Sequence, residues 1–441
     1  MKAFLILMVL IGLFGQLRAQ KGDFITVDGT YLIKDGQPYY FLGANLWYGM
    51  FLGSEGEAGD RERLIRELDR LQALGIGNLR VMAGSEGPEG EPWRMQPALQ
   101  NRPCKLDKDL LKGLDFLLVE MNKRDMKAVL VLNNFFQWSG GMAQYVSWAR
   151  GKEIPYPHKE GHNWDEFQRF SALFYGDEKA QQIFRTFIKK LALRRNSISG
   201  MNYRDDPTIM SWQLANEPRG FGQGENYIRW ADETAAFIKS LDRNHLVSLG
   251  GEGKTSSDHA GTDFENVSKS RHLDYLTAHL WIENWSWYDP RTPETFETAL
   301  ENALAYLEDH VQIAQRLNKP LVIEEFGVSR DRRDYHPDAP VTLRDRFFQT
   351  FFEAAYGYAC EKTPLMGTNF WCWAGEGRPA NPGEFWKKGD PLTGDPPHES
   401  QGWYSVYDSD ESTLGIIRTY TGKFGAIAKK QESVRSTEKS D

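Results

Sequence analysis

The sequence predicts an α/β protein folded as a closed (β/α)8 barrel, and three observations support this fold class. Short β-type runs alternate with amphipathic helical stretches over most of the 441 residues. Eight such runs occur, which is the number of strands that closes a parallel barrel. An open doubly wound sheet usually carries a glycine-rich phosphate-binding turn after its first strand, whereas Gly43-Ala44-Asn45-Leu46-Trp47 stands at that position here.

The eight β-type runs are rich in apolar residues and are separated by stretches with helical periodicity. They are Tyr39–Asn45, Gly77–Met82, Ala128–Leu132, Ile209–Leu214, Leu246–Leu249, Tyr275–His279, Leu321–Glu325 and Gly367–Trp371. One helix is predicted from leucines 64, 68, 71 and 74, which share a face, and a second from Asp109 to Lys123. Further helical patterns cover roughly 179–194, 226–241, 294–317, 343–359 and 415–430.

Turn signals before the first run predict an N-terminal β-hairpin. Asp28-Gly29 and Asp35-Gly36 separate short alternating runs, and we expect the hairpin to cap the floor of this TIM barrel. Residues 149–178 and 374–414 are long for barrel connections, so they predict long upper loops that could wall off a cleft.

The first twenty residues differ from the rest of the chain. Lys2 precedes an apolar run from Phe4 to Phe14, and Ala19 is a small residue at which a peptidase could cut. The run is too short to span a bilayer, so residues 1–19 are predicted to be a signal peptide, with a buried N-terminal helix as the alternative. Residues 20–441 are then expected to form one barrel domain, secreted or periplasmic and free of the membrane.

Composition argues against several functional classes. The net charge is −8 and no basic run interleaves with aromatics, so nucleic acid is not an expected partner. The nine histidines are dispersed and no His-Glu-x-x-His motif occurs, so neither a catalytic metal nor another cofactor is expected. No Gly-x-Ser-x-Gly motif favours an esterase. Cys104, Cys360 and Cys372 allow at most one bridge, and the sequence leaves their pairing open.

Two glutamates stand where barrel enzymes carry their chemistry, at the C-terminal ends of strands. Glu217 follows the fourth predicted strand directly, and Glu325 ends the seventh. Paired carboxylates can cleave a glycosidic bond, one as proton donor and the other as nucleophile. Because the two face each other across one barrel mouth, we expect the retaining geometry, with carboxyl groups about 5–5.5 Å apart.

Aromatic density also favours a sugar substrate, because indole rings pack on the apolar faces of sugars. The chain contains 14 tryptophans and 18 tyrosines. The tryptophans in or beside the predicted upper loops are Trp138, Trp148, Trp281, Trp285, Trp287, Trp371, Trp373 and Trp386.

These motifs resemble glycoside hydrolase family five. Asn216-Glu217-Pro218 is similar to its acid/base motif, and Glu325-Phe326-Gly327 to its nucleophile motif. Segments 203–219, 140–145 and 370–378 look like its bacterial endo-β-1,4-mannanases, and the resemblance covers about residues 24–428. Candidate substrate-binding residues, taken from this resemblance and from the strand ends, are Asn216, Arg80, His279, Trp371, Trp373, Trp281, Trp138, Trp47 and Asn134.

The resemblance implies a monomer that hydrolyses β-1,4-mannosidic bonds in mannan, galactomannan or glucomannan. Asn216 is the expected neighbour of the sugar's 2-hydroxyl, which distinguishes mannose from glucose; orienting Glu217 is its alternative role. An exo-acting mannosidase, an endoglucanase of the same fold and a non-catalytic glycan-binding protein are the alternatives. Endo or exo action depends on the shape of the loops.

Three further expectations concern individual side chains. The family usually has a tyrosine two residues after the sixth-strand histidine, whereas this chain has Trp281, which puts that residue's role in doubt. Strand alternation predicts that Glu324 points away from the pocket into which Glu325 points. Arg80 is expected to pair with Glu325 and keep its pKa normal or low, while burial and the negative charge of Glu325 raise the pKa of Glu217.

Overall fold

The computed structural model describes residues 24–91, 93–255 and 257–438. The predicted signal peptide, residues 1–19, lies outside these residues and stays a prediction. None of the helices in the described residues is long and apolar enough to cross a membrane.

Eight parallel strands form the barrel, which confirms the predicted fold class. Along the chain they are β4 (Phe41–Asn45), β5 (Asn78–Met82), β8 (Lys127–Val131), β9 (Ile209–Gln213), β10 (Leu246–Ser248), β11 (Leu276–Leu280), β12 (Leu321–Phe326) and β13 (Leu365–Phe370). Their order in the sheet is β10-β9-β8-β5-β4-β13-β12-β11. A parallel bridge between Ser248 and Tyr275 joins the two edge strands and closes the barrel.

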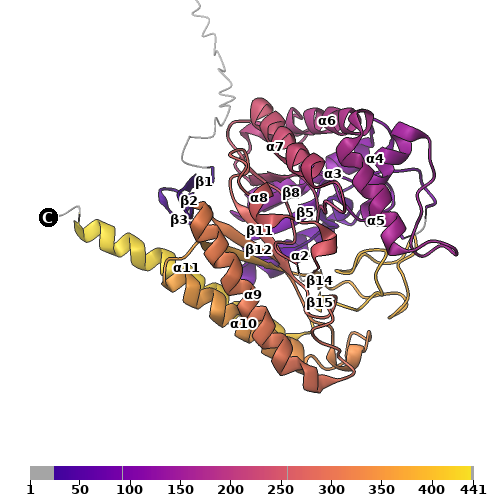
Figure 1. Ribbon diagram of the computed structural model, residues 1–441. Helices are drawn as coiled ribbons and strands as arrows, with labels where there is room; N and C mark the ends of the chain where they lie inside the picture. The colour runs from indigo at the N-terminus through magenta and orange to yellow at the C-terminus, as the bar shows by residue number, and fades with distance from the viewer. Residues whose placement is uncertain (1–23, 92, 256, 439–441) are drawn as a thin grey trace, which may run out of the picture.

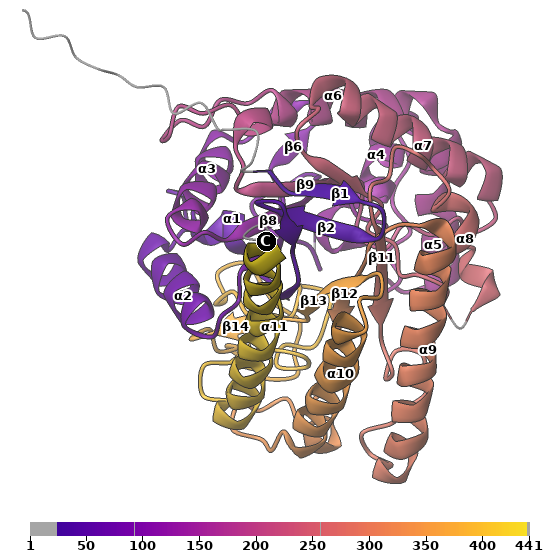
Figure 2. The ribbon, with the colours of Figure 1, turned by 90° about the vertical axis from the view of Figure 1, so that its left-hand side faces the viewer.

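Helices surround these strands (Figures 1 and 2). The long ones at predicted positions are α2 (Arg61–Ala73), α3 (Lys108–Asn122), α6 (Glu178–Ala192), α7 (Gly224–Leu241), α9 (Phe296–Leu317), α10 (Thr342–Cys360) and α11 (Glu411–Glu438). Four more were not predicted: α1 (Gly49–Leu52), α4 (Gly141–Arg150), α5 (Trp164–Ala172) and α8 (Phe264–Val267). Helix α5 lies within the expected upper loop 149–178, where Asn163 caps its first turn by accepting a hydrogen bond from the backbone N–H of Glu166.

The predicted hairpin is a three-stranded antiparallel sheet of β1 (Thr26–Asp28), β2 (Tyr31–Lys34) and β3 (Gln37–Pro38). Asp35 and Gly36 both have positive φ, 52° and 76°, as a two-residue hairpin turn requires. Lys34 pairs at 2.6 Å with Asp125, just before β8, and Tyr31 donates to the carbonyl of Lys362, just before β13. The sheet therefore lies at the N-terminal ends of the barrel strands, as expected, opposite the long loops (Figure 1).

Short elements complete the connections between the strands and helices. They are β6 (Gln100–Arg102), β7 (Lys105–Leu106), β14 (Trp373–Gly375), β15 (Val406–Tyr407) and 3-10 turns at Gln137–Ser139, Leu173–Gly176, Tyr203–Asp205, Asp258–Ala260, Pro293–Thr295 and Asp331–Arg333. The three cysteines are free thiols, with Cys372 buried and Cys360 exposed.

Polar side chains are hydrogen-bonded to one another inside the barrel below its mouth. Asn369 of β13 donates to Asn78 of β5 at 3.0 Å, and a Cβ on Gly43 would lie 2.3 Å from the Asn369 amide nitrogen, so β4 needs glycine there. Buried polar groups that are hydrogen-bonded have fixed orientations.

Candidate active site

A cavity of about 630 Å³ occupies the C-terminal mouth of the barrel, where barrel enzymes carry out their chemistry. Both predicted catalytic glutamates line it. The predicted binding residues that also line it are Asn216, Trp138, Trp281 and Trp371.

Glu217 lies four residues beyond the end of β9 and has a φ of 49°, in the left-handed region that non-glycine residues rarely adopt. Its N–H donates to the carbonyl of Gly250, and the N–H of Asn216 donates to that of Asn133. These bonds hold the strained backbone so that the Glu217 carboxylate points into the cavity. Strain of this kind is concentrated at functional sites.

His279 of β11 bridges the two glutamates. Its Nδ1 lies 2.8 Å from Glu217 Oε1 and 3.3 Å from Glu325 Oε2. One carboxylate oxygen of Glu217 lies within 4.8 Å of one of Glu325, close to the separation expected for retaining glycosidases and well short of the roughly 6.5–9.5 Å of inverting ones. Burial lowers the pKa of His279, so its imidazole is neutral.

Arg80 of β5 lies beneath the pair and hydrogen-bonds Glu325 Oε1. Its other nitrogens donate to Gln213 Oε1 at 2.7 Å and to Asn216 Oδ1 at 2.8 Å. Asn216 in turn donates through Nδ2 to Asn134 Oδ1 at 3.2 Å. Since Arg80 fixes the amide oxygen and Asn134 takes one N–H, the second N–H of Asn216 is left to face the cavity.

The pKa shift of Glu217 agrees with the prediction from the sequence, whereas the pKa shift of Glu325 contradicts it. Burial raises the pKa of Glu217, while Arg219, Arg80 and a hydrogen bond from Trp281 oppose the rise. Burial also raises the pKa of Glu325 well above its ordinary value, and the predicted pairing with Arg80 is present but only partly offsets it. The expectation of a normal or low pKa at Glu325 is therefore wrong for the substrate-free site.

Glu324 does not line the cavity, as expected, although its side chain does not point out of the barrel. It faces the barrel interior, where Oε2 accepts from Gln213 at 2.6 Å and lies 3.7 Å from Arg80 Nε. The alternation rule fails because the register of β12 against β11 slips at this point: Ala278 pairs with Ile323, and His279 with Glu325. Burial raises the pKa of Glu324 to about 7. It remains a supporting acid below the cavity.

The other predicted binding residues lie at different depths. Trp47 does not line the cavity; its indole donates to the carbonyl of Gly394 and its ring packs edge-on against Trp138. Trp373 corrects our expectation of a sugar platform, because its ring is fully buried and its N–H donates to Glu67 of α2 at 2.9 Å. Trp281, which stands where the family has tyrosine, hydrogen-bonds Glu217.

Sequence reasoning missed the cavity residues contributed by the long upper loops. Glu399 is the most informative: its Oε2 is buried without a hydrogen-bond partner, and burial raises its pKa well above the ordinary value. Others from these loops and their neighbours are His158, Trp164, Gln168, Glu283, Asn284, Arg333, Phe385, His398 and Trp403. No local pattern distinguishes these residues from solvated loop residues, although the unusual length of segments 149–178 and 374–414 pointed to the right region.

The loops after β8 and β13 meet above the cavity. The rings of His158 and Phe385 lie 5.3 Å apart, and His398 stacks on Trp138 at 6.2 Å. Because β5 and β4 lie between β8 and β13 in the sheet, these contacts close the side of the mouth above β5 and β4. On the other side, above β9, β10 and β11, the lining residue Asn284 is exposed and Trp285 is half-buried.

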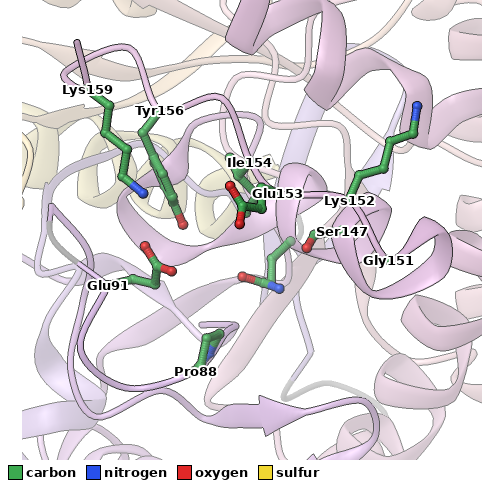
Figure 3. A pocket seen from close by; sticks show the side chains of 10 residues that line it. Pro88, Glu91, Ser147, Gly151, Lys152, Glu153, Ile154, Tyr156 and Lys159 are labelled. Carbon is green, nitrogen blue, oxygen red and sulfur yellow. The ribbon is translucent and has the colours of Figure 1, made fainter. Parts of the chain in front are cut away.

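A second cavity, of about 350 Å³, lies behind the loop that carries His158 (Figure 3). Glu91, Glu153, Tyr156 and Lys159 line it, and the Tyr156 hydroxyl accepts a hydrogen bond from Arg94 at 2.9 Å. None of the predicted site residues lines this cavity.

Comparison with known proteins agrees with this geometry. The model of the family described as GH family 5 beta-mannosidase-like matches residues 22–429. The chain belongs to glycoside hydrolase family 5. It is an enzyme that hydrolyses β-mannosidic bonds. Membership of this family agrees with the (β/α)8 barrel and with the polar residues at its mouth that are described above.

Individual relatives of this family 5 enzyme are of two kinds. Mannan endo-1,4-beta-mannosidase 7 of Arabidopsis thaliana is 31% identical over 79% of this chain and 78% of its own. A glycoside hydrolase family 5 mannosidase from Rhizomucor miehei has a structure with a TM-score of 0.87 and 39% identity, covering 93% of this chain and 100% of that one. A variant of that mannosidase has been crystallised in complex with mannosyl-fructose.

Proposed function

We propose that this family 5 enzyme is an exo-acting β-mannosidase that removes single mannose residues from the non-reducing ends of β-1,4-linked manno-oligosaccharides. The observation that carries the proposal is the contact of the loops after β8 and β13 above β5 and β4. A polymer cannot continue through a side of the mouth that aromatic rings close. The sequence favoured endo action, and this geometry favours the exo alternative.

The closed end of the cavity suits a terminal sugar. Trp371 forms part of its wall, with Trp138 and Trp281 against it at ring separations of 6.4 and 6.1 Å. Glu399 offers a carboxyl oxygen without a protein partner. A terminal sugar has a free hydroxyl at position 4, which an inner sugar of the chain lacks. An inner sugar would therefore leave the buried Glu399 oxygen without a hydrogen-bond partner, which weakens that complex.

The catalytic roles follow from the pair's surroundings. We assign Glu325 as the nucleophile, because Arg80 hydrogen-bonds it alone of the two and so favours its ionisation. Glu217 donates its proton to the departing oxygen and then activates water, while the neutral His279 aligns both groups. The spare N–H of Asn216 is available for the 2-hydroxyl, which is axial in mannose.

Product analysis of borohydride-reduced mannotetraose tests the proposal. An exo enzyme attacking the non-reducing end releases mannose and the reduced trisaccharide first. Early mannobiose with reduced mannobiose would show endo action, as the names of the plant relatives suggest, and would overturn the exo assignment. NMR of the first product should show the β-anomer, because a double displacement retains configuration.

The acceptance of oligosaccharides is part of the same proposal, and the mannosyl-fructose complex of the Rhizomucor miehei relative supports it. We expect mannotriose and mannotetraose to be better substrates than mannan. Turnover of carboxymethyl cellulose at equal rates would instead favour an endoglucanase.

We also propose that the enzyme is exported, which rests on residues 1–19 alone. Export with cleavage after Ala19 is checked by N-terminal sequencing of protein from the medium or periplasm. Full-length protein found only in the cytoplasm would reject it.

A further inference from the structure

The bridge between the two glutamates has the composition of a transition-metal site. Glu217 Oε1, His279 Nδ1 and Glu325 Oε2 lie within 4.8 Å of one another, and all three residues are buried. His279 is 0% exposed, and its Nδ1 faces both carboxylates, 2.8 Å from Glu217 and 3.3 Å from Glu325. Imidazole nitrogen and carboxylate oxygen are both ligand types that bind zinc.

The separations also fit an ion. Two ligands held at about 2.0–2.2 Å from one tetrahedral ion lie about 3.3–3.6 Å apart. The His279 nitrogen lies 2.8 and 3.3 Å from the two carboxylate oxygens, close to this spacing, and the two oxygens lie within 4.8 Å of each other, so the glutamate side chains must draw together to bring all three to bonding distance. An ion there would take the place of the hydrogen that His279 now shares with the carboxylates.

The surroundings hold the ligands in place. Arg80 binds Glu325 through Oε1 and leaves Oε2 directed at His279. Outer contacts of this kind orient metal ligands, although Nε2 of His279 itself has no hydrogen-bond partner. Since Glu217 and Glu325 line the cavity, a fourth ligand such as water can enter from it.

We propose that these three residues bind Zn²⁺ when the cavity holds no sugar, and that the ion inhibits the enzyme by competing with substrate. The ion would occupy the space between the carboxylates into which the anomeric carbon must move, and it would engage the nucleophile. Ca²⁺ and Mg²⁺ are not expected to bind, because they need six or more oxygen ligands or several retained waters. Cu²⁺ should bind more tightly than Zn²⁺.

Calorimetric titration of the whole enzyme with ZnCl₂ alone tests binding without relying on catalysis. We expect one tight site in the wild type and loss of affinity by more than about 100-fold in His279→Gln and in Glu217→Gln, since each loses a ligand. The matched control is His162→Ala, which removes an exposed histidine that lies 2.8 Å from Glu166 and offers a surface alternative for the ion. Its titration should match the wild type.

Two measurements on the wild-type enzyme test the proposal without relying on variants that could misfold. Saturating mannose should weaken the Zn²⁺ titration, and Zn²⁺ should raise KM for an aryl β-mannoside without changing kcat. Binding that His162→Ala abolishes, binding that mannose leaves unchanged, or inhibition that lowers kcat alone would each overturn the proposal. These outcomes are independent of whether the enzyme acts as an exo- or an endo-mannosidase, because binding is measured without turnover and the competition concerns one sugar.

Discussion

The two sides of the barrel mouth have different architectures although the same eight strands support both. Above β5 and β4, long loops from β8 and β13 meet through His158 and Phe385, and Lys388 lies 3.5 Å from Glu57 at the rim. Above β9, β10 and β11, the lining residues include the exposed Asn284 and the half-buried Trp285, and Arg219 pairs with Glu252 at 2.6 Å. The barrel positions the reacting groups, and the loops determine which part of a sugar chain can reach them.

Replacing Glu217 should have the largest effect on kcat/KM, and it should distinguish the open side of the mouth from the closed side. In Glu217→Ala, kcat/KM for mannotriose should fall by roughly 10²–10⁴-fold, because the departing sugar on the open side needs its proton. An aryl mannoside with a good leaving group should lose much less in its first step. The measurement is kcat/KM on both substrates, with added azide restoring turnover through the vacated space.

Glu325→Ala serves as the comparison, since it should abolish turnover of both substrates. If Glu217→Ala lowered both substrates equally, Glu217 would not be the acid.

How much of this site the sequence predicts can be judged from its tryptophans. Trp138, Trp281, Trp285 and Trp371 line the cavity, as their places near strand ends suggested. Trp373 stands only two residues beyond Trp371, yet its ring is buried against α2. Periodicity locates strand ends but does not say where a side chain points once the backbone leaves the strand.

Contacts between the loops are even harder to predict from the sequence than the direction of a side chain. Eight strands and both glutamates follow from patterns within about ten residues, whereas the closure of the mouth depends on contacts such as His158 with Phe385, 227 positions apart in the sequence. Glu399 carries no local signal at all. The slip of β12 at Glu324 is likewise invisible, because it arises from pairing with β11.

The free energy of unfolding should depend on pH more through Glu86, on the closed side of the mouth, than through Glu252, on the open side. Glu86 lies beneath Gly141, whose N–H it accepts, and burial raises its pKa to about 8. A raised pKa means that folding favours the protonated form, so its contribution is present at low pH and is lost as pH rises toward 8. On the open side, burial also raises the pKa of Glu252, but the charge of Arg219 and its bidentate hydrogen bond oppose the rise.

Urea unfolding at pH 5, 6, 7 and 8 measures how the free energy of unfolding depends on pH. The free energy of unfolding of the wild type should fall relative to Glu86→Gln as pH rises, by up to about 1.4 kcal/mol per pH unit. Parallel pH curves for the two proteins would contradict the assignment.

Opening the closed side should change the products. In the double variant His158→Ala with Phe385→Ala, the ring contact between the loops is gone, and longer chains should be able to extend over β5 and β4. We expect internal cleavage of mannotetraose to rise by about tenfold, since each lost aromatic contact is worth roughly 0.5–1.5 kcal/mol. The ratio of mannobiose to mannose at early times is the measurement.

Ile198→Ala is the control for general loosening, because Ile198 is 49% exposed and lies in the connection between α6 and β9, away from the mouth. Unchanged products in the double variant would mean that other loop contacts keep this side closed.

The smallest effect is expected on the open side, at Trp285. This half-buried ring lines the cavity beside Glu252 and Asn284, where the leaving sugar should lie. Trp285→Ala removes a packing surface worth about 0.5–1.5 kcal/mol, so kcat/KM for mannotriose should fall by about two- to tenfold. An aryl mannoside, which has no second sugar to pack there, should change less.

The matched control is Trp287→Ala. The Trp287 ring lies 5.0 Å from that of Trp285 but does not line the cavity. If packing of the leaving sugar is the cause, Trp285→Ala should raise KM for mannotriose while Trp287→Ala leaves it unchanged. Equal losses in both variants would mean that the pair only supports the loop after β11 and that the leaving sugar does not pack on Trp285.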